Sequence, residues 1–221
     1  MTSGQLEASL SNLGTATIAD ALDRLGVHGT CLGIKPIGAG FSLAGRARTV
    51  RYGPCGPTKG TVGDFVEDYA PGTIAVLDNS ARTDCTVWGD ILTEFAHRNQ
   101  LGGTVIDGVC RDTDLYAQLG YPVFARGQFM RTGKDRVQVE QLDGPVSIGG
   151  VRVACDDIVI GDSDGVVVVP SGLAEEILDA ALDIAQQEDQ IRRAIRAGSR
   201  LSEARSQFGY HSLQSNRAQA T

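Results

Sequence analysis

The chain has 221 residues, 42% hydrophobic and 21% charged, and this length suits one globular domain with a terminal extension. Its net charge of −7, with no basic stripe interleaved with aromatic residues, argues against nucleic acid as a direct partner. Because the chain has no membrane-spanning apolar run, no secretory leader pattern and no CxxC pair among its five cysteines, we expect a reduced, cytoplasmic protein without a membrane partner.

The first predicted element is a helix over residues 15–25, capped by Thr15 or Thr17 and ended by Gly26. Glycine-punctuated strands over 33–52, a loop over 53–60 and a short helix over 61–68 follow. Next come strands over 72–79, 104–108 and 121–127, separated by helices over 87–99 and 112–119. Because strands and helices alternate at this spacing, we predict a parallel sheet with right-handed crossovers.

The last third of the chain has a different pattern. Residues 145–170 predict a series of short β segments, with Asp164 and Gly165 as a hairpin turn. A long helix is predicted over 173–197, and its first half is amphipathic. Its second half is too polar to bury well against its own core, so it is either a solvated end or a segment that reaches a neighbouring subunit. The tail after residue 205 is predicted to be loosely ordered.

Two short segments carry the residues that point to chemistry. Gly89 and Asp90 begin one predicted helix, and Arg111 and Asp112 begin the next, just past a strand. Ligands of open parallel sheets bind at the carboxyl ends of the strands, where helix N-termini favour an anion. Either aspartate alone is also typical of a helix cap. A cap needs no arginine, however, whereas a carboxylate-bearing substrate bound next to a metal does.

The supply of ligands indicates which metal such a site would hold. The three histidines and five cysteines show no zinc-ligand spacing, so aspartate carboxylates and water are the candidate ligands, and these suit Mg²⁺ or Mn²⁺. The segment GDSDG at 161–165 matches a nucleophile elbow in its letters. That motif requires a strand-to-helix turn, and both flanks here are β-like, so Ser163 is predicted to be a turn residue.

Several segments together resemble a known family, in matching order and spacing across residues 13–200. They read TATIADALDRLG, GRARTV, WGDILTEFA, GGTVIDGVCRD, YPVFARG and DDIVIGDSDGVVVVP. The chain resembles the RraA-like family, and within it the class II 4-hydroxy-4-methyl-2-oxoglutarate / 4-carboxy-4-hydroxy-2-oxoadipate aldolases. Active members of that family carry an aspartate, twenty intervening residues and then Arg-Asp. In this chain those residues are Asp90, Arg111 and Asp112.

The resemblance implies an α/β fold and a particular assembly. The expected fold is a layered sandwich with a central mixed, partly parallel β-sheet of the phosphohistidine-domain-like, RraA type, plus a long C-terminal helix. Residues 1–172 would form the catalytic domain, and residues 173–221 a helix and tail that pack on a neighbouring subunit. The site would lie between subunits of a homotrimer, or of a homohexamer made of two trimers.

The resemblance also implies a role for each site residue. Asp112 would bind Mg²⁺ directly, and Asp90 would hold water on the metal. Arg111 would hydrogen-bond the 2-oxo oxygen of the substrate and stabilise the enolate. The neighbouring subunit would contribute Glu188, which matches a glutamate that contacts water on the metal. The substrate carboxylate would be received by the backbone amides of Gly89, Asp90, Ile91 and Leu92.

The expected function is a divalent-metal-dependent carbon–carbon lyase for small 2-oxo acids, through retro-aldol cleavage to pyruvate, oxaloacetate decarboxylation, or both. One alternative is a non-catalytic regulator that binds a ribonuclease. Another is a related lyase or isomerase for a different 2-oxo acid. Segment 127–140 differs from what the aromatic-degradation aldolases carry, so it either lies near the substrate and alters the accepted carbon skeleton or forms a surface hairpin.

Overall fold

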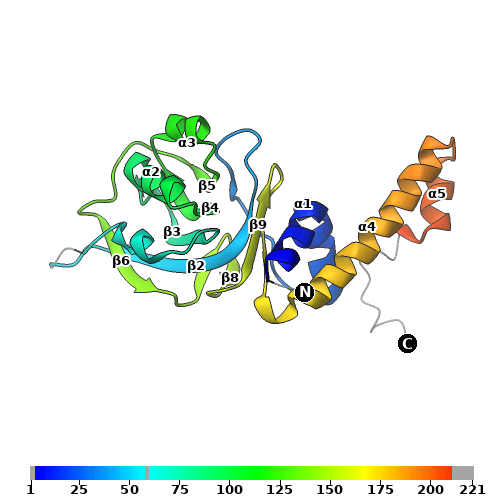
Figure 1. The fold of residues 1–221 in the computed structure, drawn as a ribbon, viewed down its shortest axis with the longest axis horizontal. Coiled ribbons are helices and arrows are strands. Elements are labelled where there is room, and N and C mark those ends of the chain that lie inside the picture. The colour runs from blue at the N-terminus through cyan, green and yellow to red at the C-terminus, as the bar shows by residue number, and fades with distance from the viewer. Residues whose placement is uncertain (1–2, 58–59, 211–221) are drawn as a thin grey trace.

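The computed structural model describes residues 3–57 and 60–210, which form a mixed α/β fold (Figure 1). The helices are α1 (Ser3–Leu25), α2 (Asp90–Arg98), α3 (Thr113–Leu119), α4 (Ala174–Arg196) and α5 (Leu201–Gln207), with short 3-10 helices η1 (Asp64–Asp68) and η2 (Ser171–Leu173). The strands are β1 (Lys35–Pro36), β2 (Leu43–Pro54), β3 (Ile74–Thr86), β4 (Gly103–Cys110), β5 (Val123–Gln128), β6 (Val137–Leu142), β7 (Val146–Ile148), β8 (Val151–Val153), β9 (Ile158–Asp162) and β10 (Gly165–Val169). No helix among these described residues is both long and apolar enough to cross a bilayer.

The central sheet is mixed, as expected. Its strand order is β1-β5-β4-β3-β2-β9-β10, and β6 also pairs with β2. The strands β2, β3, β4 and β5 run parallel to one another, while β1, β6, β9 and β10 pair antiparallel with their neighbours. The predicted parallel β-α-β-α-β unit is therefore confirmed as β3-α2-β4-α3-β5. Its strands are buried on both faces, which explains why they are continuous apolar runs rather than alternating ones.

Strand β2 is long enough to pair with two different strands on the same side. Residues 43–46 pair with β9, whereas residues 50–54 pair with β6. Between them, the Ala47 amide donates to the Asp157 carbonyl at 2.9 Å, and the Asp143 amide donates to the Thr49 carbonyl at 2.8 Å. The pairing of β6 also brings the amide of Val139 within 3.0 Å of the Thr61 carbonyl. Two segments far apart in the sequence, near 61 and near 137, thus lie side by side.

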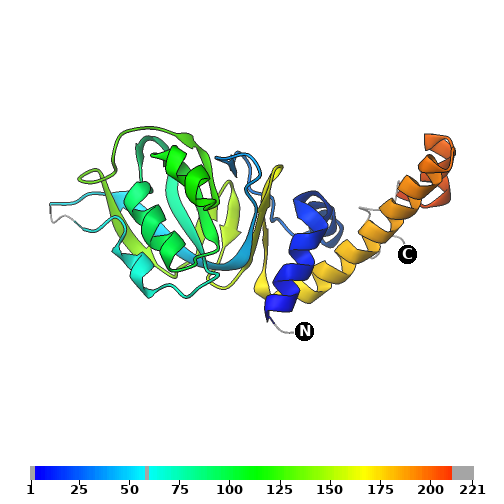
Figure 2. The same ribbon diagram turned by 45° about the horizontal axis from the view of Figure 1, so that its top comes forward.

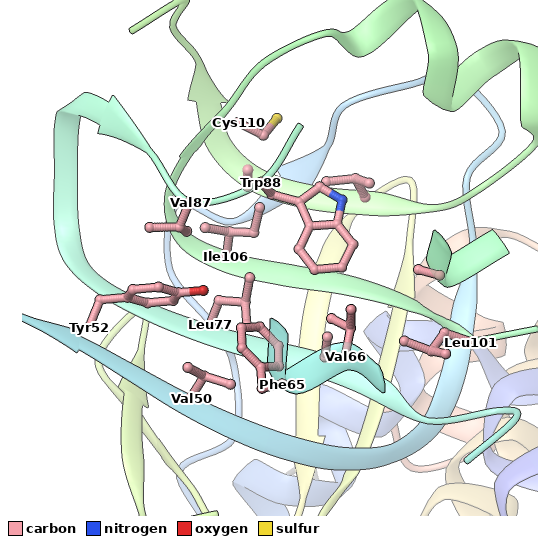
Figure 3. Packing of buried hydrophobic residues seen from close by; sticks show 14 of the residues in the cluster. Val50, Tyr52, Phe65, Val66, Leu77, Val87, Trp88, Leu101, Ile106 and Cys110 are labelled. Atoms are coloured by element: carbon pink, nitrogen blue, oxygen red, sulfur yellow. The ribbon is translucent and has the colours of Figure 1, made fainter. Parts of the chain in front are cut away.

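Three hydrophobic clusters hold the layers together. The first lies between the sheet and its cover of α2, α3 and η1, and it includes Trp88, Val66 and Ile106 (Figure 3). The second joins the other face of the sheet to the β7–β8 hairpin. The third packs α1 and the first half of α4 on β9 and β10, so these helices lie on the far side of β9 from α2 and α3 (Figures 1 and 2).

The beginning of the chain departs from the prediction. Residues 3–13 are helical as well, and α1 is two helical segments joined at Gly14, whose φ of 79° is in the left-handed region. The second segment has the predicted extent, 15–25. Its first amide is held from elsewhere, because the Asp162 carboxylate accepts hydrogen bonds from the Thr15 amide at 2.8 Å and the Thr15 hydroxyl at 2.7 Å. This contact crosses 147 residues, so local sequence gives no sign of it.

Other boundaries are corrected by a few residues. Strand β3 continues to Thr86, past the predicted end at residue 79, and α2 begins only at Asp90. The hairpin turn between β9 and β10 is formed by Ser163 and Asp164, because Gly165 already pairs with Asp162. Ser163 is therefore a turn residue, as predicted. After α4 the chain forms α5 up to Gln207, so the tail is helical at 205–207, and residues 211–221 lie outside the described part.

Candidate active site

The two predicted site segments meet at one edge of the sheet. Strand β3 leads through Val87, Trp88 and Gly89 into α2, and the neighbouring parallel strand β4 leads through Arg111 and Asp112 into α3. A backbone hydrogen bond of 3.1 Å from the Arg111 amide to the Trp88 carbonyl joins these two loops. The loops are held side by side, because adjacent parallel strands deliver their carboxyl ends to the same place.

The side chain of Asp112 faces the start of α2. Its Oδ2 atom lies 3.3 Å from the Asp90 amide nitrogen and 3.2 Å from Arg111 Nε. Gly89 leaves room for this contact, since a Cβ there would lie 2.8 Å from Asp112 Oδ2 and 3.2 Å from Arg111 Nε and would displace these side chains. The side chains of Arg111 and Asp112 keep 36% and 39% of their surface exposed, so both remain available to a ligand.

The backbone conformation separates Asp112 from an ordinary helix cap. Asp112 precedes α3 with φ 59° and ψ 38°, in the left-handed region that few residues other than glycine adopt. Its side chain makes no capping hydrogen bond to α3 and points instead toward Gly89 and Asp90. Asp90 differs, because its Oδ1 accepts a hydrogen bond of 2.8 Å from the Ile91 amide of its own helix. Asp90 therefore acts in part as a cap of its own helix, whereas Asp112 does not cap α3.

A cavity of about 450 Å³ opens beside these residues. Gly89, Asp90, Ile91, Leu92 and Arg111, all expected at the site, line it. Asp112 reaches the same place through its contacts with Asp90 and Arg111 rather than as part of the wall. Ile91 is 78% exposed, which is unusual for a large apolar side chain at a site and leaves it available to a substrate or a second subunit.

Other parts of the cavity wall come from residues that the sequence did not single out. Residues 60–64, Thr132 and Lys134 line the cavity as well. The turn around Gly133 is pressed against the end of β3, because a Cβ on Gly133 would lie 2.3 Å from the Thr86 carbonyl oxygen. The Thr86 amide also donates to the Arg131 carbonyl at 2.9 Å. Segment 127–140 therefore contributes to the cavity wall.

Glu188 lies elsewhere in the chain. It is on α4, which lies on the other side of β9 from α2 and α3 (Figures 1 and 2). Its Oε2 accepts a hydrogen bond of 3.1 Å from Arg192, one turn further along the same helix. The structure of one chain thus does not bring Glu188 to Asp90, Arg111 and Asp112, and its role through a neighbouring subunit stays a prediction.

The donors at this edge fit a hard divalent cation. Within the described residues, no three histidine, cysteine or acidic side chains cluster as a complete ligand set. Asp112 and Asp90 supply carboxylate oxygens only, and a cation such as Mg²⁺ accepts one or two carboxylates and completes its shell with water and substrate oxygens. The nearby Cys110 is no nucleophile, since burial raises the pKa of its thiol to about 12.

The fold and this edge define an α/β protein whose candidate site lies on parallel-strand loops around two aspartates and an arginine. Residues 15–168 match the RraA-like family model, described as Aldolase/RraA, and the chain belongs to that family. One relative is a protein of Halalkalibacterium halodurans that is provisionally named a 4-hydroxy-4-methyl-2-oxoglutarate aldolase. It is 33% identical to this chain, and the match covers 82% of this chain and 84% of that protein. This chain is 38% identical, over 91% of its length, to the protein DlpA of Legionella pneumophila, but it spans only 33% of that protein.

Solved structures agree with the family assignment. An uncharacterized protein of Pseudomonas syringae pv. tomato superposes with a TM-score of 0.85 at 39% identity, covering 92% of this chain and 98% of that one. Streptomyces coelicolor RraAS2, described as an unusual member of the RNase ES inhibitor RraA protein family, superposes with a TM-score of 0.77 at 32% identity, covering 86% of this chain and 97% of that one. The family thus includes relatives named as enzymes and relatives named as inhibitors.

Proposed function

We propose that this chain is a divalent-metal-dependent carbon–carbon lyase that acts on small 2-oxo acids. The observation that carries the proposal is the meeting of Asp112 with Arg111 and Asp90, which line one cavity, while Asp112 makes no capping hydrogen bond to its own helix. A protein-binding role does not require an aspartate that contacts an arginine of a cavity wall instead of capping its helix. The aldolase name given to the Halalkalibacterium halodurans relative supports the same reaction class.

Each residue has a distinct task in the proposed reaction. Asp112 would hold Mg²⁺ or Mn²⁺, with Asp90 beside it, and the bound cation supplies a Lewis acid next to the substrate's 2-oxo and carboxylate oxygens. The amides of Gly89, Asp90, Ile91 and Leu92 at the start of α2 would receive the substrate carboxylate, which would replace the Asp112 and Asp90 oxygens that accept from the Asp90 and Ile91 amides in this structure. Arg111 donates to the 2-oxo oxygen, where negative charge develops when the bond between C3 and C4 breaks.

The same site can serve two related reactions. In both, the electron pair of the C3–C4 bond moves toward C3 and is delocalised onto the 2-oxo oxygen beside Arg111. Decarboxylation of oxaloacetate releases CO₂ and needs no base. Retro-aldol cleavage also requires removal of the proton from the 4-hydroxyl, and Asp90 and a neighbouring subunit's Glu188 are the candidate carboxylates. No lysine Schiff base is needed.

Two further residues of the cavity wall suggest which substrates are accepted. Thr132 and Lys134 line the same cavity as the start of α2. The turn that carries them is braced by Arg136, whose guanidinium donates to the Thr132 carbonyl at 3.2 Å and to the Lys134 carbonyl at 3.4 Å. Arg136 thus holds the backbone of this turn, and the exposed Lys134 side chain that it carries could reach a second, distal carboxylate on the substrate.

The assembly and the location of the protein belong to the same proposal. We expect a homotrimer or homohexamer in which α4 of one subunit brings Glu188 to the edge of the next. Five free cysteines are consistent with a reducing compartment, and we place the protein in the cytoplasm. Its partners are then 2-oxo acids and further copies of itself, without nucleic acid or membrane.

The direct test is pyruvate release from oxaloacetate and from 4-hydroxy-4-methyl-2-oxoglutarate. Turnover is measured with Mg²⁺, with a chelator, and with the Asp112→Ala variant. Asp114→Ala is the matched control, because Asp114 is an exposed aspartate in the first turn of the same helix. We expect turnover by the wild type and the control that stops with chelator and with Asp112→Ala.

Two results would overturn the proposal. Turnover that does not depend on the metal, or full activity of Asp112→Ala, would remove the metal-dependent mechanism. If the folded wild type turns over no 2-oxo acid, the ribonuclease-regulator alternative gains. A pull-down with a ribonuclease as bait then tests that alternative.

A further inference from the structure

Beneath the cavity, a buried series of hydrogen bonds begins at Trp88, the single tryptophan of the sequence. Trp88 is 1% exposed, and its indole Nε1 donates to the Thr93 hydroxyl at 2.8 Å. The Thr93 hydroxyl in turn donates to the Gly89 carbonyl at 2.8 Å, and the Thr93 amide bonds the same carbonyl at 3.1 Å. Thr93 is fully buried, so these bonds do not compete with water.

The series of hydrogen bonds continues from the loop after β3 to the loop after β4. The Trp88 carbonyl accepts from the Arg111 amide at 3.1 Å, and the Arg111 carbonyl accepts from the hydroxyl of Tyr116. Tyr116 is fully buried, and burial, followed by the nearby Cys110 thiol, raises the pKa of its hydroxyl. Burial thus favours the protonated hydroxyl, the form that donates to the Arg111 carbonyl.

These bonds hold three carbonyls of the two site loops, those of Trp88, Gly89 and Arg111. In a trans peptide, the carbonyl and the N–H of the next residue point in opposite directions. Holding the Gly89 carbonyl on the buried Thr93 thus turns the Asp90 amide the other way, and this amide reaches Asp112 Oδ2 at 3.3 Å. Holding the Trp88 carbonyl on the Arg111 amide likewise turns the Gly89 amide away from the loop after β4. Holding the Arg111 carbonyl fixes the peptide on which Asp112 adopts its left-handed conformation.

We infer that Trp88, Thr93 and Tyr116 are positioning residues that orient the amides of Gly89 and Asp90 and fix Arg111 and Asp112 toward the cavity. This inference rests on the proposed function, because it gives those amides a carboxylate to bind. It also assigns separate tasks to the two hydroxyls. Thr93 acts on the amides that hold the substrate in both ground and transition states, whereas Tyr116 acts on the loop of Arg111, whose contact strengthens as charge develops.

Two single substitutions and two controls separate these tasks. Thr93→Val removes the Thr93 hydroxyl and keeps nearly the same side-chain shape. Tyr116→Phe removes the Tyr116 hydroxyl in the same way. Thr93→Ser keeps a hydroxyl and is the conservative rescue. Tyr121→Phe is the matched control, because Tyr121 is another buried tyrosine whose hydroxyl pairs with Thr104 at 2.9 Å, near the opposite end of β4.

The first readout is binding of oxalate, a planar mimic of the pyruvate enolate, in the presence of Mg²⁺, followed by calorimetry and by the single indole N–H resonance. We expect Thr93→Val to weaken oxalate binding and raise KM by about 10-fold, and Tyr116→Phe to lower kcat by about 10-fold with little change in KM. Thr93→Ser and Tyr121→Phe should behave as the wild type does. Wild-type oxalate affinity and kinetics in both Thr93→Val and Tyr116→Phe would overturn the inference.

A second readout does not require activity. Amide hydrogen exchange at Asp90 and Arg111, measured without ligand, should accelerate in Thr93→Val and stay unchanged in Tyr121→Phe. If the wild type neither binds oxalate nor turns over a 2-oxo acid, the proposed function fails, and the exchange rates still decide whether these residues hold the loops. Unchanged exchange in Thr93→Val would then contradict the positioning role.

Discussion

Strands β3 and β4 and the loops that follow them carry two pairs of aspartates, and the two pairs differ in burial and in hydrogen bonding. Asp78 and Asp107 are register partners on neighbouring strands and are 8% and 5% exposed. Amides of Ser80 and Ser147 donate to Asp78 at 2.9 Å and 3.2 Å. Asp107 accepts from the Gly149 amide at 2.8 Å and pairs with Arg126. These carboxylates tie the β7–β8 hairpin to the sheet.

Asp90 and Asp112, by contrast, stand on the loops just beyond the strands and remain exposed. Both contacts of Asp112 fall on its Oδ2 atom, so within the described chain the carboxylate retains acceptor capacity for a cation. The comparison teaches that residue type and sheet edge do not distinguish a functional carboxylate from a structural one. The state of its hydrogen bonds does, and the predictions below test that distinction.

The largest effect is expected for Asp112→Asn. Removing the negative charge takes away the proposed direct metal ligand, so turnover should fall by about 10³-fold, the scale on which loss of a key electrostatic group acts. Because the side chain is exposed, the thermal midpoint should stay close to that of the wild type. Assays with saturating Mg²⁺ and thermal scans measure the two quantities. Normal turnover, or inactivity caused by unfolding, would show that Asp112 does not differ from the structural aspartate Asp107 in the way proposed.

The opposite pattern is expected for Asp107→Ala. Its loss leaves the Arg126 guanidinium and the buried Gly149 amide without their acceptor, which should cost about 3 kcal/mol of unfolding free energy. For a chain of this size, that corresponds to a fall of roughly 6–12 °C in the thermal midpoint. Urea unfolding at one subunit concentration measures the cost. Turnover per folded molecule should remain within about 2-fold of wild type, and a stable but inactive variant would show that Asp107 belongs to the site.

A smaller and more selective effect is expected for Lys134→Met. The loss of a charge-assisted contact should raise KM by about 10-fold for 2-oxo acids with a distal carboxylate. Their monocarboxylic counterparts should be unaffected. Competition between 2-oxoglutarate and 2-oxobutyrate for the site gives the measurement, and Lys35→Met is the matched control on a different surface. Equal effects on both ligands would place Lys134 outside the distal subsite.

The smallest effect concerns Asp162, a structural carboxylate that caps the second segment of α1. Burial raises its pKa, but hydrogen bonds from Thr15, Asp164 and Gly165 outweigh burial and lower the pKa below 3.8. The carboxylate therefore stabilises the fold fully above pH 3.8, and this contribution is lost as pH falls through the lowered folded pKa. Asp162→Ala should cost about 1 kcal/mol at neutral pH.

Urea midpoints between pH 2.5 and 7 test this sign. The wild type should lose more stability than Asp162→Ala as the pH falls below about 4. Asp164→Ala, in the same turn, removes a carboxylate without removing the cap. A variant at Asp162 with the same acid dependence as the wild type would show that the cap contributes nothing through its charge.

Much of the parallel core could be predicted from local pattern. The runs that became β3, β4 and β5 are continuously apolar and alternate with helical periodicity, so their buried parallel pairing follows from short-range signals. The same logic placed Gly89–Asp90 and Arg111–Asp112 at one edge. Errors in that region are boundaries, such as the extension of β3 to Thr86.

The rest depends on contacts between distant residues. Antiparallel pairing of β2 with β6 brings segment 60–64 and the turn at Thr132–Lys134 to the cavity, and no local pattern encodes that pairing. The Thr15 amide is capped by the distant Asp162 carboxylate. The Arg111 carbonyl is held by the Tyr116 hydroxyl, although the sequence pattern marks Tyr116 only as an ordinary core residue of α3. Residues 3–13 form a helix that packs on β9 and α4, a partnership that their own sequence does not show.

Hydrogen–deuterium exchange at the methyl group of pyruvate tests enolate stabilisation by Arg111 and the metal without knowledge of the physiological substrate. Exchange in D₂O, followed by proton NMR, reports whether the site stabilises the enolate. We expect exchange catalysed by the wild type with Mg²⁺ that is lost with a chelator, with Arg111→Ala and with Asp112→Asn. Failure of the folded, Mg²⁺-loaded wild type to exchange the methyl protons would contradict this expectation.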